Sequence, residues 1–129
     1  MPKKIMVIDD EPDIRIYLMT ALEDRGYETC TIEENDPIDK AVLANKPDLI
    51  VLDIMMPRRS GISIYKELRR TEALKNIPIA LISGMSPVNN FMEEINKKID
   101  NGTISPPDGF IEKPVKLPAF MELVKKLLE

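Results

Sequence analysis

Residues 50–57 read IVLDIMMP, an aliphatic run that ends in a carboxylate and then meets a proline. A segment with apolar residues at successive positions is typical of a central strand in a parallel sheet, because helices cover both faces of such a sheet. We therefore predict a strand from Leu49 to Asp53. A charge at the end of so apolar a strand needs a partner or a chemical task, because burying it alone is costly.

The remaining sequence repeats this pattern of short apolar runs, each followed by a segment with helical periodicity. Strands are predicted at residues 4–9, 27–32, 49–53, 77–83 and 109–111, and helices are predicted to begin near residues 12, 36, 60, 92 and 118. The last helix is expected to bury Phe120, Leu123, Leu127 and Leu128. Alternation of five strands with five helices, joined by right-handed crossovers, predicts an α/β fold with a doubly wound parallel sheet. The length suits a single domain that covers residues 1–129.

Composition argues against several classes of function. The net charge of -4 disfavours direct binding to nucleic acids or to membrane surfaces, because both need basic surfaces. The chain has no histidine, so any bound metal is expected to be a hard cation held by oxygen atoms. The apolar run at residues 5–8 is too short for a signal peptide or a membrane span, and Cys30 is the only cysteine. These features predict a cytoplasmic protein.

Polar side chains follow four of the predicted strands at their carboxyl ends. In a doubly wound sheet, ligands bind outside this edge, so residues that are distant in sequence meet there. The residues that we expect to converge are Asp9, Asp10, Asp53, Ser83 and Lys113. Three carboxylates at one edge would repel one another, and a divalent cation such as Mg²⁺ would relieve this repulsion.

The same residues have the chemistry for phosphoryl transfer. An ionised carboxylate can attack phosphorus without a general base, and Asp53 is best placed to be this nucleophile. Ser83 and Lys113 could contact oxygens of the transferring group. Taken singly, each residue also fits a structural role, such as a helix cap for the aspartate pair at residues 9–10 or a surface position for Lys113. Their common place at one sheet edge favours the chemical interpretation.

These residues lie in motifs that together span almost the whole chain. The motifs are VIDDEP at residues 7–12, DIMMP at residues 53–57 with Gly61 four residues on, Ser83-Gly84 and Lys113-Pro114. With these motifs the chain resembles the receiver domain of two-component response regulators. The resemblance implies a flavodoxin-like sheet with strand order 2-1-3-4-5. It also implies a signalling domain that catalyses only its own phosphorylation and dephosphorylation, and not an enzyme that acts on other substrates.

The resemblance implies a role for each residue of the acidic site. Asp53 would accept a phosphoryl group from a histidine kinase or a histidine phosphotransfer protein. The Mg²⁺ ligands would be Asp9, Asp10, Asp53 and the backbone carbonyl of Met55. Lys113, before a cis peptide bond to the following proline, would pair with Asp53 or with its phosphoryl group.

The resemblance also implies a switch. Ser83 and Phe110 match the switch pair of the family, and their movement on phosphorylation would change the surface around the fourth and fifth strands and the helices that follow them. This surface would bind an output protein or a fused effector domain. Dimerisation on phosphorylation is a further expectation.

Alternative functions fit the sequence less well. A metal-dependent phosphatase with an aspartyl nucleophile needs a second acidic residue two positions after the nucleophile, where this chain has Met55. A receiver fold could also act as a protein-interaction module without phosphorylation. The full set of repelling carboxylates argues against this alternative, because a module with no chemistry to perform has no need of them.

Overall fold

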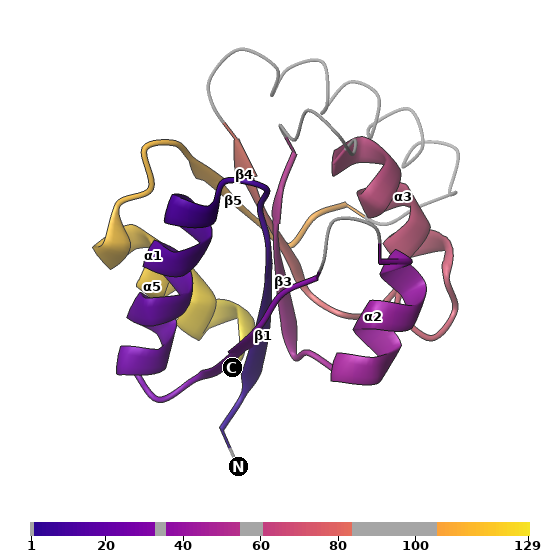
Figure 1. Ribbon diagram of the computed structural model, residues 1–129, viewed down its shortest axis with the longest axis horizontal. Coiled ribbons are helices and arrows are strands. Elements are labelled where there is room, and N and C mark those ends of the chain that lie inside the picture. The colour runs from indigo at the N-terminus through magenta and orange to yellow at the C-terminus, as the bar shows by residue number, and fades with distance from the viewer. Residues whose placement is uncertain (1, 33–35, 55–60, 84–105) are drawn as a thin grey trace.

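The computed structural model describes residues 2–32, 36–54, 61–83 and 106–129, and these residues form a parallel sheet between two layers of helices (Figure 1). The strands are β1 (Lys4–Ile8), β2 (Glu28–Cys30), β3 (Leu49–Asp53), β4 (Ile79–Ser83) and β5 (Gly109–Glu112). Their order in the sheet is β2-β1-β3-β4-β5, and every neighbouring pair is parallel. The predicted fold class and strand order are therefore confirmed.

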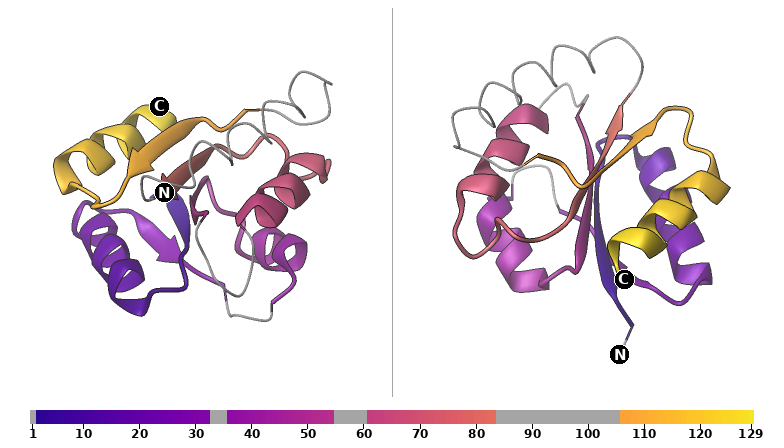
Figure 2. Two further views of the ribbon diagram at one scale, coloured as in Figure 1. Left: turned by 90° about the horizontal axis from the view of Figure 1, so that it is seen from above. Right: turned by 180° about the vertical axis from the view of Figure 1, so that it is seen from behind.

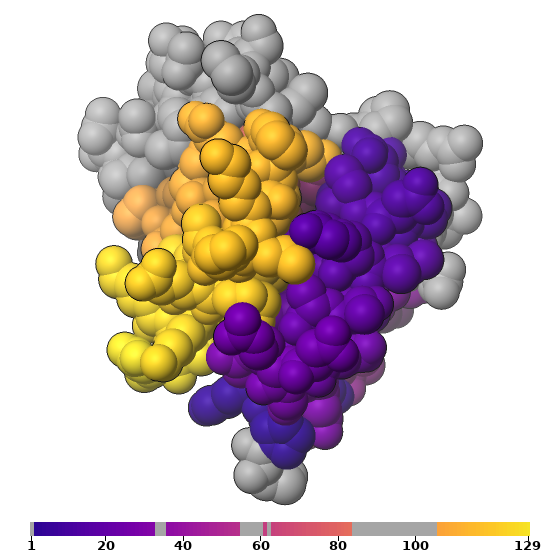
Figure 3. Space-filling model, turned by 90° about the vertical axis from the view of Figure 1, so that its left-hand side faces the viewer, coloured from indigo at the N-terminus to yellow at the C-terminus, as the bar shows by residue number. Residues whose placement is uncertain are grey.

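Helices cover both faces of the sheet. They are α1 (Pro12–Asp24), α2 (Ile38–Asn45), α3 (Gly61–Arg70) and α5 (Leu117–Leu127). Helices α1 and α5 lie side by side on one face, and α2 and α3 lie on the other (Figure 2). Figure 3 shows the outer side of the first pair, with α1 in indigo to purple beside α5 in yellow. The prediction of five helices is corrected to four for the described residues, because the fifth was expected near residues 92–99, which lie outside them.

The apolar character of the central strands explains how one sheet fills two cores. All five residues of β3 are buried. Because successive side chains of a strand point to opposite faces, neighbouring residues of β1 and β3 enter different clusters. Met6, Ile8, Ile50 and Leu52 pack toward α2 and α3, whereas Ile5, Val7, Leu49 and Val51 pack toward α1 and α5. None of the helices among the described residues has the length and apolar character needed to cross a bilayer.

The stripe that α5 buries differs in part from the prediction. Phe120 is fully buried as expected, and Met121 and Val124 complete the buried set of this helix. Leu123 and Leu127 are only half-buried and lie at the border of the stripe, as does Leu128 just after the helix. The sequence contains apolar residues at all these positions, so periodicity alone did not fix which side faces the sheet.

A buried arginine connects the segments at the amino ends of β4 and β5, at the end of the sheet opposite the acidic residues. The Arg69 side chain is 3% exposed, and its Nη2 lies 2.6 Å from Oδ2 of Asp108. The same guanidinium group donates hydrogen bonds to the backbone carbonyls of Lys75, Ile77 and Pro106 and to the hydroxyl of Tyr65. Oδ2 of Asp108 also accepts the backbone N–H of Ile79, at 2.9 Å. This Arg69–Asp108 network therefore joins the end of α3 to the first residue of β4 and to the segment that enters β5.

Candidate functional site

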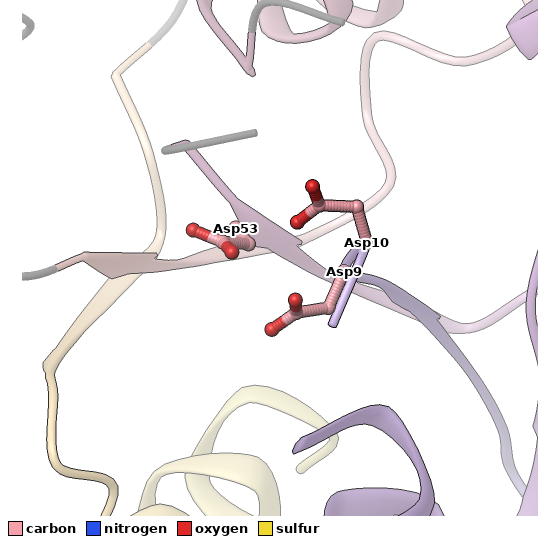
Figure 4. Close-up of side chains that lie close together, drawn as sticks. All are labelled: Asp9, Asp10 and Asp53. Atoms are coloured by element: carbon pink, nitrogen blue, oxygen red, sulfur yellow. The ribbon is translucent and has the colours of Figure 1, made fainter. Parts of the chain in front are cut away.

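Three aspartates lie together at the carboxyl ends of β1 and β3. The two strands pair in parallel with Ile8 opposite Leu52, so the next residues, Asp9 and Asp53, lie side by side at the carboxyl ends of these strands. One carboxylate oxygen from each of Asp9, Asp10 and Asp53 lies within 4.8 Å of the others. The three side chains surround one space (Figure 4). Asp9 and Asp53 are buried, whereas Asp10 is exposed.

Lys113 brings a positive charge to these carboxylates. It follows β5, and its backbone N–H donates to the carbonyl of Ser83 at 2.8 Å. Its Nζ lies 3.1 Å from Oδ2 of Asp53 and 4.0 Å from Oδ2 of Asp9. Burial opposes the charge on this amine, but the hydrogen bond and charge of Asp53 outweigh burial, and the pKa of Lys113 is raised. Lys113 therefore stays protonated at neutral pH. The peptide bond between residues 113 and 114 is cis, as expected.

Asp9 has a buried carboxylate oxygen that lacks a hydrogen-bond donor among the described residues. Its Oδ1 accepts the backbone N–H of Glu11 at 2.9 Å, but its buried Oδ2 accepts no hydrogen bond within the part of the chain that the structure describes. Burial raises the pKa of Asp9 to about 6, with the negative charge of Asp53 adding to the effect and the Glu11 hydrogen bond and the charge of Lys113 opposing it. A buried oxygen without a donor, beside two further carboxylates, fits a hard divalent cation.

Without divalent cations, Asp9→Asn is expected to stabilise the protein at pH 7. The pKa of Asp9 is higher in the folded than in the unfolded chain, so the folded state binds more protons between about pH 4 and 6, and the wild type loses stability as the pH rises through that range. Asparagine removes this penalty, and the free energy of unfolding should rise by about 1–3 kcal/mol at pH 7. Urea unfolding in EDTA measures it. An equal gain at pH 4 and pH 7 would contradict the explanation, because the penalty disappears once Asp9 is protonated.

The proposed switch residues lie on the neighbouring strands. Ser83 ends β4, is fully buried, and lies one position beyond Ile82, the residue that pairs with Asp53. Phe110 lies on the adjacent strand β5, is half-buried, and packs against the cluster beneath α2 and α3. The structure thus brings Ser83 to the same edge as the carboxylates and places Phe110 one strand away. Met55 lies outside the described residues.

Gly61, the glycine of the second motif, marks a close approach of two backbones. A Cβ atom at this position would lie 2.3 Å from the Cα of Ile54 and 3.0 Å from the carbonyl oxygen of Asp53. Real Cβ atoms do not approach backbone atoms so closely, so only glycine fits while this geometry is kept. The start of α3 therefore rests directly on the residues that end β3.

Glu11 lies within the first motif, but the sequence alone predicts no role for it. Its Oε1 is 3.6 Å from Nζ of Lys113, so Glu11 joins Asp53 and Asp9 as a third carboxylate within 4.0 Å of this amine. Glu11 and Lys113 lie near opposite ends of the chain, so no local pattern signals the contact. The only available signal was its place directly after two aspartates at the end of a strand.

Comparison with known proteins agrees with this geometry. The family model of the response regulator receiver domain matches residues 5–125. The polar-differentiation response regulator DivK of Brucella anthropi is 30% identical over 131 residues, which cover 99% of this chain and 98% of DivK. The phosphate regulon transcriptional regulatory protein PhoB of Pseudomonas aeruginosa is 34% identical over 104 residues, which cover 81% of this chain but only 45% of PhoB.

A solved receiver-domain structure has the same fold as this chain. The receiver domain of NtrX from Brucella abortus superposes with a TM-score of 0.78 at 28% sequence identity, covering 96% of this chain and 97% of that domain. The sheet order, the acidic cluster and the family match over residues 5–125 all agree. The chain therefore belongs to the response regulator receiver domain family of two-component signal transduction.

Proposed function

We propose that this chain is one phospho-accepting receiver domain, in which Asp53 takes a phosphoryl group from a phosphohistidine. The observation that carries the proposal is the contact of 3.1 Å between Nζ of Lys113 and the fully buried Oδ2 of Asp53, beside two further carboxylates. A purely structural ion pair would not need those two extra negative charges. Family membership supports the same reaction.

The chain's own residues suit the chemistry of transfer. A carboxylate oxygen of Asp53 forms a bond to phosphorus while the P–N bond of the donor breaks, and the electron pair of that bond leaves with the donor imidazole. Lys113 stays protonated and is already within hydrogen-bond distance of Asp53, so it can follow the new negative charge on the phosphoryl oxygens. The hydroxyl of Ser83, one strand away, is the second donor that could reach them.

The acidic cluster supports a Mg²⁺ site. Asp9, Asp10 and Asp53 would hold the ion together with the backbone carbonyl of Met55. The supporting observation is that the buried Oδ2 of Asp9 accepts no hydrogen bond from the described residues. When bound, Mg²⁺ would neutralise charge on the transferring oxygens. Asp9 and Asp10 bind and orient, and they make no bond to phosphorus.

The proposal extends to partners and to the switch. The donor would be a cytoplasmic histidine kinase or histidine phosphotransfer protein, and Ser83 and Phe110 would pass the change at Asp53 to the surface around β4, β5 and α5. That surface would bind an output protein or a fused effector domain, or a second phosphorylated copy. The match covers only 45% of PhoB. The remaining part of such a longer relative leaves room for an effector domain.

Intact mass spectrometry tests the proposal. Incubation with phosphoramidate and Mg²⁺ should add the mass of one phosphoryl group, and EDTA should prevent the addition. Hydroxylamine should then remove the group, because it cleaves acyl phosphates and leaves phosphate esters intact. A folded protein that gains no adduct under any of these conditions would contradict the proposal and favour a phosphorylation-independent interaction module.

A further inference from the structure

We propose that Glu11 is a positioning residue that competes with the phosphoryl group for Lys113. This inference rests on the proposed function. Lys113 Nζ lies 3.1 Å from Oδ2 of Asp53 and 3.6 Å from Oε1 of Glu11, with Oδ2 of Asp9 farther away at 4.0 Å. Glu11 is therefore the nearest carboxylate to this amine after Asp53.

The side chain of Glu11 does not cap the helix that it precedes by a hydrogen bond. Glu11 is the N-cap of α1, but its side chain makes no capping hydrogen bond. Helix caps favour the short side chains of serine, threonine, aspartate and asparagine, which reach the first free N–H groups. The capping role expected of an N-cap residue therefore does not explain why the Glu11 carboxylate turns toward Lys113.

The backbone of Glu11 is nevertheless firmly placed. Its N–H donates to Oδ1 of Asp9 at 2.9 Å, and its carbonyl accepts the N–H of Arg15 at 3.0 Å. Arg15 in turn donates from its guanidinium group to the backbone carbonyl of Asp9 at 2.9 Å. These bonds fix the base of the Glu11 side chain relative to the acidic cluster, so its carboxylate reaches the rim of the site.

The ion pairs of Lys113 with Asp53 and with Glu11 differ in strength. The side chain of Asp53 is fully buried, whereas that of Glu11 is 59% exposed. Water and salt screen an exposed ion pair, so the Glu11 contact is the weaker and more easily exchanged of the two. When a phosphoryl group is attached to Asp53, Lys113 must bind the new oxygens. The weaker ion pair with Glu11 is then the contact that breaks. Glu11 thereby lowers the affinity of the site for an anionic phosphoryl group.

The substitution Glu11→Gln should remove this competition. The half-saturating concentrations of phosphoramidate in adduct formation and of beryllofluoride in Mg²⁺-dependent binding should both fall about two- to fivefold, the range expected for an exposed ion pair. The maximal rate of adduct formation should stay the same, because Lys113 and Asp53 are unchanged. Raising the ionic strength should shrink the difference between variant and wild type. A role confined to folding would give neither this split nor this salt dependence.

Asp13→Asn is the matched control. Asp13 is an exposed carboxylate in the first turn of the same helix, so its loss changes the net charge equally and close by, and it should leave both half-saturating concentrations unchanged. Equal effects of the two substitutions would overturn the proposal in favour of a general field effect, and no effect of Glu11→Gln would overturn it outright. The wild type, measured alongside, separates the two proposals: without a wild-type adduct the proposed function fails, whereas a normal wild-type adduct with an unresponsive Glu11 variant rejects only this inference.

Discussion

Asp53→Asn should abolish the phosphoryl adduct and leave the fold intact. An amide oxygen is too weak a nucleophile to attack phosphorus, so no acyl phosphate can form at this position. The amide has nearly the shape of the carboxyl group and can still accept the hydrogen bond from Lys113 at 3.1 Å. It also removes one of the three mutually repelling carboxylates. Intact mass after incubation with phosphoramidate and Mg²⁺ measures the loss, and circular dichroism measures the fold.

A control variant and a mapping experiment show whether this result is specific to residue 53. Asp13→Asn, which removes an exposed carboxylate, should keep the full adduct. If Asp53→Asn still gains a phosphoryl group, peptide mapping after borohydride reduction would find the acceptor at another carboxylate. That outcome would reject Asp53 as the phospho-acceptor even though the chain is phosphorylated.

Arg69→Met should produce the largest loss of stability among the single substitutions considered. Its side chain is 3% exposed and holds three backbone carbonyls as well as Asp108, so methionine would leave these acceptors without their donor. The five hydrogen bonds that Arg69 donates would be lost, and at about 0.5–1.5 kcal/mol each the free energy of unfolding should fall by about 3–5 kcal/mol. Urea unfolding measures this loss through a lower midpoint at an unchanged slope.

Substitution of Asp108, the ion-pair partner of Arg69, should cause a smaller loss of stability. The side chain of Asp108 is 41% exposed, and asparagine can still accept hydrogen bonds from Arg69 and from the N–H of Ile79, so Asp108→Asn should cost about 1–2 kcal/mol. The exposed neighbour Arg70 provides a control, because Arg70→Met should stay within about 0.5 kcal/mol of the wild type. Equal costs at Arg69 and Arg70 would show that the Arg69–Asp108 network contributes nothing measurable.

The fold could be predicted because its main signals are local. The strand over Leu49–Asp53 was predicted with the bounds that the structure has, since an unbroken aliphatic run has few alternatives in a chain with this alternation. The convergence of Asp9, Asp10 and Asp53 followed from one rule, that parallel strands end at a common edge. That rule brings side chains to an edge but gives no distances between them.

The contacts that were missed depend on distances and on directions around a helix. Arg69 and Asp108 are 39 residues apart, and each looks like an ordinary surface charge in the sequence. Glu11 lies within a recognised motif, yet only the path of the chain after β5 places Lys113 beside it. In α5, Leu123 was predicted in the core and Val124 was not, because neighbouring apolar residues leave the rotation of the helix open by one position.

The close contact at Gly61 limits how this protein can change over evolutionary time. Every other amino acid carries a Cβ, and a Cβ here would lie 2.3 Å from the backbone of Ile54, the residue that follows Asp53. A lineage could therefore replace Gly61 only by moving the backbone beside Asp53. Changes at the start of α3 must therefore fall on the residues that follow Gly61 in the helix, because a single substitution at residue 61 would clash with the backbone of Ile54.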